Sequence, residues 1–305
     1  MASPDLLSGM IIRAQSGFLT VHTEQGPVVA QLRGRLKQHR LDTDLAAVGD
    51  RVRVSLLEDG TGAIEEIEPR QRVLSRRAPS ARYQAEQVIV ANPDQAVFVF
   101  ACADPDPNFR MLDRFLVVAE SQSLPAVICA NKLDLVVPSS ARKEFREYER
   151  LGYRVFYTSA KSGKGIKGLR RALVGRLSVL AGPSGVGKSS LLNAIQPGLG
   201  LRTKEVTRAT RKGKHVTVVP ELLPLDGGGF VADTPGLRAL SLWDIEPEEL
   251  DAYFPEIRPW IPECEFNDCT HVHEPGCAVI AAVSRGSVSP ERYDSYCRIR
   301  LGEPD

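Results

Sequence analysis

The 305-residue sequence predicts an α/β P-loop fold with circularly permuted nucleotide-binding motifs, preceded by a small β-barrel and followed by a small, mainly helical zinc-binding domain. Three observations lead to this prediction. A phosphate-loop pattern starts at Gly182, two guanine-binding motifs come before it instead of after it, and three cysteines gather near a histidine late in the chain. Because a nucleotide site forms where strand ends converge in space, its pieces can be reordered along the chain without destroying it.

The composition narrows the class of protein. A chain of this length that is 43% hydrophobic is expected to form two or three domains with cores of their own. A formal net charge of +1 gives no global case for binding nucleic acid, so any such case depends on local patches. No apolar run approaches the length of a membrane span, and residues 1–10 lack the basic start and apolar stretch of a secretory signal. We therefore expect a cytoplasmic monomer without a membrane partner.

The N-terminal part, residues 1–72, alternates short β-rich runs with glycine and charged turns. The runs lie at residues 9–23, 27–33, 50–57 and 63–68. This spacing predicts a small all-β barrel or sandwich. Residues 33–40 are basic without an acid, and their composition favours a solvated loop. Residues 70–82 carry five arginines and no acid, which indicates a linker able to lie along phosphates.

The central part, residues 73–240, has the pattern of an α/β domain from about residue 88 onward. The expected strands lie at residues 96–101, 126–130, 154–157, 177–181, 216–223 and 230–232, and the expected helices at 110–121, 142–151 and 189–195. This alternation predicts a largely parallel sheet covered by helices. Cys102 and Cys129 fall in apolar, strand-like runs, so we expect buried thiols.

The phosphate loop has the pattern Gly-x4-Gly-Lys-Ser between a predicted strand and a predicted helix, which is the context this motif requires. Its backbone N–H groups are expected to wrap the phosphates, helped by the N-terminus of the helix. Lys188 is expected to reach the β- and γ-phosphates, and the Ser189 hydroxyl to bind Mg²⁺. The predicted nucleotide contacts in this segment are Gly182, Pro183, Ser184, Gly185, Val186, Gly187, Lys188, Ser189 and Ser190.

The choice of guanine over adenine depends on the segments Asn131-Lys132-Leu133-Asp134 and Ser159-Ala160-Lys161. The Asp134 carboxylate can accept from both N1–H and the exocyclic amine of guanine, a donor pair that adenine lacks. Asn131 is expected to fasten the loop, while the stem of Lys132 covers one face of the ring. The backbone N–H of Ala160 is expected to face the guanine O6.

The switch segments follow the phosphate loop. Asp233-Thr234-Pro235-Gly236 is expected to place Asp233 in the Mg²⁺ shell and Gly236 at the γ-phosphate. Leu237 then stands where many GTPases have the glutamine that positions water, so this role is open. Thr217 is the candidate switch I ligand for Mg²⁺, and His215 is either a catalytic substitute for the glutamine or a solvent-exposed side chain. We expect slow turnover until a partner completes the site.

The switch I segment is also strongly basic. Its cations are Arg202, Lys204, Arg208, Arg211, Lys212 and Lys214, with Glu205 as the only acid. Six cations exceed what three phosphates with Mg²⁺ require, which indicates contact with an RNA backbone.

The metal-site candidate is Cys264-x4-Cys269-x-His271-x5-Cys277, three thiolates and one imidazole within fourteen residues. Four soft or borderline ligands without a carboxylate favour a closed tetrahedral Zn²⁺ site. A closed site leaves no position for a catalytic water, so we expect the metal to be structural and to stabilise a segment too short for its own core. His273 is a nearby rival to His271 that we interpret as solvated. Disulfides are disfavoured in a cytosolic chain.

The permuted motif order, the N-terminal barrel and the Cys-Cys-His-Cys site together resemble the ribosome small-subunit-dependent GTPases of the RsgA or YjeQ family over essentially the whole chain. The resemblance implies an OB-fold at residues 1–72, a circularly permuted GTPase domain at 73–240 and a zinc-binding domain at 241–305. It also implies a factor that acts late in maturation of the 30S subunit, contacts 16S rRNA, and hydrolyses GTP to GDP when that subunit stimulates it. The family's switch I element is His-Thr-Thr, and here it is His215-Val216-Thr217, so the first threonine is absent.

Two other functions are compatible with parts of the sequence. One is a GTP-gated protein adaptor in which hydrolysis is incidental, the arginines are solubilising and the zinc domain grips a protein. The other is an RNA-binding zinc protein with an inactive nucleotide domain, which conflicts with the intact Lys188, Ser189 and Asp233. The leading hypothesis is a GTP hydrolase that depends on the small ribosomal subunit, with Lys188, His215 and Thr217 as its catalytic residues.

Overall fold

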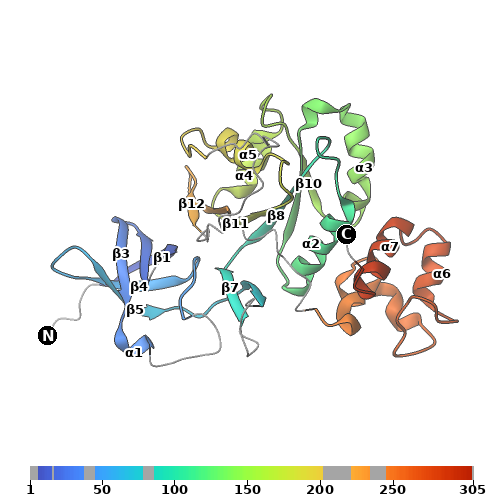
Figure 1. Ribbon diagram of the computed structural model, residues 1–305, viewed down its shortest axis with the longest axis horizontal. Helices are drawn as coiled ribbons and strands as arrows, with labels where there is room; N and C mark the ends of the chain where they lie inside the picture. The colour runs from blue at the N-terminus through green and yellow to red at the C-terminus, as the bar shows by residue number, and fades with distance from the viewer. Residues whose placement is uncertain are drawn as a thin grey trace, which may run out of the picture.

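The computed structural model describes residues 6–15, 17–37, 45–77, 86–201, 221–233 and 245–303. Three parts follow one another along the chain: a β-barrel, a central sheet with helices on both faces, and a helical C-terminal part beside α2 (Phe109–Ser121) (Figure 1). The predicted fold class is therefore confirmed. Within the described residues, no helix is both long enough and apolar enough to cross a bilayer.

The barrel has five strands: β1 (Leu7–Gln15), β2 (Phe18–Thr23), β3 (Gly26–Leu32), β4 (Arg51–Leu56) and β5 (Gly62–Ile67). They close in the order β1-β2-β3-β5-β4, with β1 antiparallel to both β2 and β4. The single run predicted at residues 9–23 is thus two strands of a hairpin. Alternate side chains such as Ile11, Val21 and Val52 point inward and are fully buried, as a barrel of period-two strands requires.

The two basic N-terminal stretches are more ordered than their composition suggests. The first forms the short helix α1 (Gly34–Lys37), and the side chains of Arg33 and Arg35 both pair with Glu65; residues 38–44 lie outside the described part. In the second, Arg70 pairs with the buried Asp50 at 2.8 Å, because a carboxylate without solvent needs a cation.

The predicted linker is also partly a β-hairpin. β6 (Val73–Arg77) and β7 (Glu86–Ala91) form a two-stranded antiparallel sheet, and residues 78–85 between them are not described. The backbone N–H of Ala91 donates to Val48 at 2.8 Å, so the hairpin is held against the barrel's end. Arginine content alone did not reveal this pairing, which depends on contacts with the flanking domain.

The central sheet has the order β10-β9-β8-β11-β13-β12, and every neighbouring pair is parallel except β12 with β13. Its strands are β8 (Gln95–Ala101), β9 (Ala126–Asn131), β10 (Arg154–Tyr157), β11 (Leu177–Ala181), β12 (Leu222–Pro224) and β13 (Phe230–Asp233). All six predicted strands are therefore present, although residues 216–220 of one of them lie outside the described part. β8 is buried at every position, as expected of a central parallel strand covered on both faces.

Two helix layers cover this sheet. Phe98 and Phe100 of β8 pack in one cluster with residues of α2 and α3 (Pro138–Arg150), while Val97 and Val99 pack in another with α4 (Ile166–Leu173) and α5 (Lys188–Ile195). The sequence predicted α2, α3 and α5 but not α4, whose eight residues are bounded by Gly165 and Gly175. Cys102 and Cys129 are buried, as predicted.

The C-terminal part consists of η4 (Pro247–Tyr253), η5 (Arg258–Glu263), α6 (Ala278–Ser284) and α7 (Pro290–Arg300). η4 is a 3₁₀ helix, a geometry found mostly in short pieces and connectors. The apolar cluster of the C-terminal part includes Leu250, Phe254 and Tyr296, and also Val117 from α2. The C-terminal part therefore shares its core with a helix of the central domain.

A buried charge network joins α7 to α2. The guanidinium of Arg292 donates from Nη1 to Asp113 Oδ1 at 2.5 Å and from Nε to Glu256 Oε1 at 2.6 Å, and the Tyr148 hydroxyl donates to Asp113 at 2.7 Å. The side chains of Arg292, Asp113 and Glu256 are at most 5% exposed. Burial raises the pKa of the Asp113 carboxyl. Burial also favours a lower pKa for Arg292, but the carboxylates of Asp113 and Glu256 outweigh this effect and raise that pKa. Each charge is thus stable at this depth because of the others.

Replacing Arg292 with alanine is expected to lower the free energy of unfolding of the C-terminal part by about 3–5 kcal/mol, since two carboxylates stay buried without a cation. Urea denaturation followed by tryptophan fluorescence measures this loss. Both tryptophans, at positions 243 and 260, belong to the C-terminal part of the sequence, so the signal reports on that part. Arg298→Ala on the same helix is the control: its ion pairs are partly exposed, and we expect a loss of about 1 kcal/mol or less. Equal effects of the two variants would contradict a special role for the buried pair.

Candidate nucleotide and metal sites

The predicted nucleotide motifs converge at the C-terminal edge of the central sheet. Asn131 is the last residue of β9, the phosphate loop follows β11, and Ser159 comes two residues after β10. The register pairs Leu180 of β11 with Asp233 of β13. Since parallel strands end at the same edge, segments out of order along the chain become neighbours in space.

Asn131 links the guanine-binding motif to the phosphate loop. Its Nδ2 donates to the backbone carbonyl of Val186 at 2.9 Å. Its Oδ1 accepts from the Thr158 hydroxyl at 3.1 Å and from the backbone N–H of Ala160 at 3.3 Å. The side chain is 1% exposed, so these bonds hold it in a single place. Thr158 was not singled out in the sequence; its position between a strand and Ser159 is the only signal of its role.

The Asp134 carboxylate is exposed at the edge of the site and is oriented by a neighbour. The Ser159 hydroxyl donates to its Oδ1 at 2.6 Å, and the Ser159 oxygen accepts from the Ser162 N–H at 3.0 Å. Lys132 has a left-handed backbone with φ of 60°, and its ammonium contacts the backbone carbonyl of Asp104. Asp104, which sequence reasoning missed, thereby places the loop after β8 beside the guanine-binding motif. Lys161 is exposed.

The phosphate loop has the backbone that its glycines predict. Gly182 has φ of 150°, and a Cβ there would lie 2.1 Å from the Val99 carbonyl oxygen, so no larger residue fits. Gly185 and Gly187 also have positive φ, and α5 starts at Lys188. The Lys188 ammonium donates to the carbonyls of Gly182 and Pro183 at 2.6 and 2.7 Å, so it lies within the curve of the loop. Pro183, Ser184, Ser189 and Ser190 are at least partly exposed there, and Val186 is buried.

Several predicted site residues lie outside the described part of the chain. They are His215 and Thr217 of switch I, together with Gly236. The backbone of Asp233 ends β13, but its side chain is not described. The roles assigned to these residues stay predictions.

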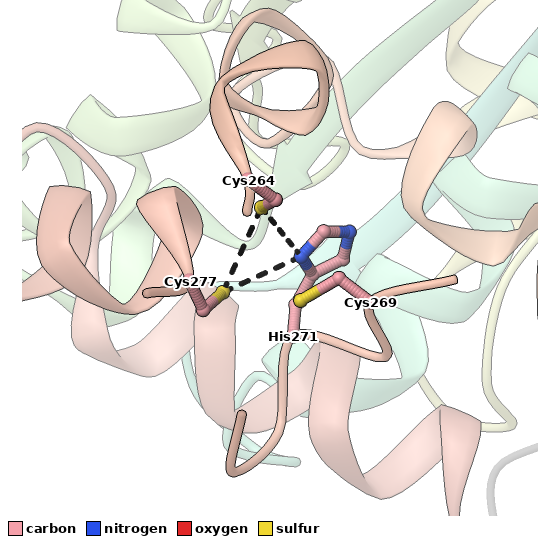
Figure 2. A group of neighbouring side chains, drawn as sticks. All are labelled: Cys264, Cys269, His271 and Cys277. Atoms are coloured by element: carbon pink, nitrogen blue, oxygen red, sulfur yellow. Dashed lines mark hydrogen bonds between the residues drawn. The ribbon is translucent and has the colours of Figure 1, made fainter. Parts of the chain in front are cut away.

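The four predicted metal ligands form one compact cluster (Figure 2). The Sγ atoms of Cys264 and Cys277 each lie 3.4 Å from His271 Nδ1 and 3.9 Å from each other, and all four ligand atoms lie within 4.8 Å. A tetrahedral zinc ion with bonds of about 2.3 Å to sulfur and about 2.0 Å to nitrogen separates its ligands by roughly 3.5–3.8 Å. The donor set and its spacing therefore fit a metal ion. His273 is exposed and lies outside the cluster.

The surroundings of the cluster favour a bound cation. Burial raises the pKa of the Cys269 thiol to about 12 and also raises the pKa of Cys277. The pKa of Cys264 is lowered instead, because backbone N–H groups of α6 and His271 outweigh its burial. A bound cation would favour the thiolate form of all three cysteines. Cys264 directly follows η5 and Cys277 caps α6, so the ligands tie together two helices that share a small core.

Asp251 of η4 orients the imidazole of His271. Its Oδ2 lies 3.1 Å from His271 Nε2, and the imidazole is 1% exposed. Because Nδ1 faces the thiols, Nε2 carries the hydrogen that Asp251 accepts, which leaves the lone pair of Nδ1 for a metal. Sequence reasoning missed Asp251, since it lies twenty residues before His271 and in no metal-binding pattern.

Replacing Asp251 with alanine is expected to lower zinc affinity by about 10–100-fold, because the imidazole loses the acceptor that sets its tautomer. Asp251→Asn should lose less, since an amide oxygen still accepts from Nε2–H. Competition with a zinc-binding dye measures the affinity, and ¹⁵N NMR of the histidines reports which ring nitrogen carries the hydrogen. Glu248→Ala, an exposed carboxylate on the same helix, should match the wild type. Unchanged zinc affinity in Asp251→Ala would rule out this role.

Comparisons with known proteins agree with this architecture. A model described as RsgA GTPase matches residues 67–243, and one described as RsgA N-terminal domain matches residues 8–64. The protein named small ribosomal subunit biogenesis GTPase RsgA from Gemmatimonas aurantiaca is 49% identical, with 96% of each chain covered. Its namesake from Moorella thermoacetica is 43% identical, with 95% of each chain covered.

Solved structures are similar along almost the full chain. The crystal structure of YjeQ from Thermotoga maritima has a TM-score of 0.79 and 38% identity, covering 97% of this chain and 98% of that one. The crystal structure of YloQ, described as a circularly permuted GTPase, has a TM-score of 0.77 and 33% identity, covering 98% and 97%.

Proposed function

Because the chain belongs to the RsgA GTPase family, we propose that it hydrolyses GTP during maturation of the small ribosomal subunit. The observation that carries this proposal is the junction at Asn131, where the guanine-binding motif and the phosphate loop are bonded to one another. Relatives covering 95% or more of both chains bear the name of that biogenesis GTPase. We propose the domains 1–72, 73–240 and 241–305, a monomeric state and action in the cytoplasm, where ribosomes assemble.

In the proposed site, Asp134 accepts from guanine N1–H and the exocyclic amine, with Ser159 holding its carboxylate in place. The Ala160 N–H, which donates to Asn131 Oδ1 at 3.3 Å, turns toward O6 when the base enters. Lys132 covers one ring face, and Lys161 borders the base. The N–H groups of residues 182–190 wrap the phosphates. Lys188 exchanges its two carbonyl partners for phosphate oxygens when the nucleotide enters.

Ser189, Thr217 and Asp233 are the proposed residues for Mg²⁺, which supplies charge neutralisation on the β- and γ-phosphates. The fit is supported by position: Ser189 is the second residue of α5, and Asp233 ends the strand beside β11. Gly236 is placed at the γ-phosphate. Leu237 cannot orient water, so His215, or RNA from the partner, takes over that role. Docking on the subunit therefore accelerates hydrolysis, and loss of the γ-phosphate then loosens the switches and releases the protein.

Zn²⁺ is the proposed structural ion of Cys264, Cys269, His271 and Cys277, since three thiolates with one imidazole favour it. The N-terminal barrel, the arginine-rich segment of residues 70–82 and the basic switch I segment are the proposed contacts to 16S rRNA, with the zinc-binding part as a further contact. The adaptor and inactive-domain alternatives have no specific support in the described residues, where the two halves of the nucleotide site are already joined.

The test is the rate of phosphate release from GTP with and without partners. Purified 30S subunits are expected to raise the rate far more than free tRNA or duplex DNA does. Lys188→Ala should remove both the basal and the stimulated rate, because the phosphates lose their cation. Equal stimulation by all three partners, or none by subunits, would overturn the proposal.

A further inference from the structure

The exposed side of α4 and of the loop before it carries positive charge alone. Its side chains are Lys161, Lys164, Lys167, Arg170 and Arg171, which we call the α4 basic face, and all five are exposed. No acidic residue occurs anywhere between positions 159 and 176. Lys167 and Arg171 are four residues apart within α4, so they point to the same side of the helix, and Lys164 lies in the loop just before it.

The helix that precedes α4 in the chain, α3, has an ordinary solvent-exposed surface with charges of both signs. There, Arg142, Lys143, Arg146 and Arg150 alternate with Glu144, Glu147 and Glu149, and Arg150 pairs with Glu147 at 3.5 Å. Among the described residues, the five cations of the α4 basic face make no ion pair; Arg170 and Arg171 donate only to backbone carbonyls. Like charges three and four residues apart repel each other on a helix surface, so this arrangement favours a negatively charged partner.

The opposite side of α4 gives no support for insertion into a membrane. Ile166, Leu169 and Leu173 are buried in the cluster shared with α5, so no apolar surface is left for insertion into lipid. None of the large exposed hydrophobic side chains in the described part belongs to α4. Recognition at this surface is therefore electrostatic, which is how proteins grip a phosphate backbone.

We propose that the α4 basic face binds the phosphate backbone of RNA on the small ribosomal subunit. The inference rests on the proposed function, which supplies an RNA-rich partner. The position of the face gives it a consequence for the nucleotide: α4 follows directly on the loop of Ser159 and Ala160, at the sheet edge of the proposed guanine site. RNA held on α4 lies next to the guanine-binding loop, in addition to any contact made by switch I.

The test compares two triple variants that remove the same number of charges. Lys164→Ala/Lys167→Ala/Arg171→Ala removes three of the five charges of the α4 basic face and leaves Arg170 and Lys161, a proposed nucleotide contact, in place. Lys143→Ala/Arg146→Ala/Arg150→Ala strips the mixed-charge surface of α3. Each protein is loaded with a non-hydrolysable GTP analogue, and its dissociation constant for purified 30S subunits is measured between about 50 and 200 mM salt. The basal GTPase rate of each variant reports intact folding.

The α4 variant is expected to bind subunits about tenfold or more weakly, with a salt slope lower by about 2–3, roughly one for each phosphate that the variant no longer neutralises. The α3 variant should stay within about twofold of the wild type, because exposed charges away from the interface are screened. Equal affinities of the two variants, with the wild type bound, would overturn this inference alone. A loss of affinity without a change in salt slope would also overturn it, in favour of a protein contact. If the wild-type protein does not bind 30S subunits, the proposed function itself is wrong.

Discussion

Asp134→Asn is expected to lower the affinity for GTP by about 10²-fold or more and to create affinity for XTP. The carboxylate offers two acceptors to the two donors of guanine, at about 1.5–3 kcal/mol for each charge-assisted bond. An asparagine amide places a donor where guanine also has a donor. Xanthine has an oxygen at that position, so the amide suits it. The bond from Ser159 to Asp134 Oδ1 keeps the replaced side chain in the same place.

Displacement of a fluorescent nucleotide by GTP, XTP and ATP measures the change. Asp106→Asn, an exposed carboxylate in the loop after β8, is the matched control and should leave all three affinities unaltered. ATP should bind weakly to the wild type and to both variants, since adenine lacks the donor pair. If Asp134→Asn retains GTP and gains no XTP, Asp134 does not select the base.

Removal of the metal is expected to unfold the C-terminal part. Structural zinc contributes an apparent 10–16 kcal/mol in small domains, more than a core of this size supplies. Cys269 and Cys277 are themselves members of the apolar cluster that holds η4, η5 and α6 together. Without the ion, three sulfurs and an imidazole lose their common centre, and the cluster loses its cross-link. The central sheet, which has its own cores, should remain folded and bind GTP.

A chelator titration followed by tryptophan fluorescence measures this unfolding, and elemental analysis should find one zinc per chain. Cys277→Ser should behave like the chelated protein. Cys297→Ser is the control, because Cys297 lies on α7 outside the ligand cluster and should keep both zinc and fluorescence. If the tryptophan fluorescence stays unchanged after elemental analysis shows that the zinc has been removed, the metal has no structural role.

Local patterns in the sequence were sufficient to predict the three-part architecture, the strands of the central sheet and the compact group of Cys264, Cys269, His271 and Cys277. Each of these depends on residues close together in the chain, where spacing and chemistry restrict what can form. A phosphate loop requires its glycines at set intervals, and four metal ligands within fourteen residues can hardly avoid one another.

Contacts between distant segments could not be predicted in this way. Arg292 and Asp113 are 179 residues apart, and nothing in their local sequence marks them as partners. The orientation of His271 by Asp251, twenty residues away in the chain, is likewise unmarked in the local sequence. The physical reason is that a buried polar group takes whichever partner the packed fold brings within bonding distance, and that partner is chosen by packing, not by spacing along the sequence.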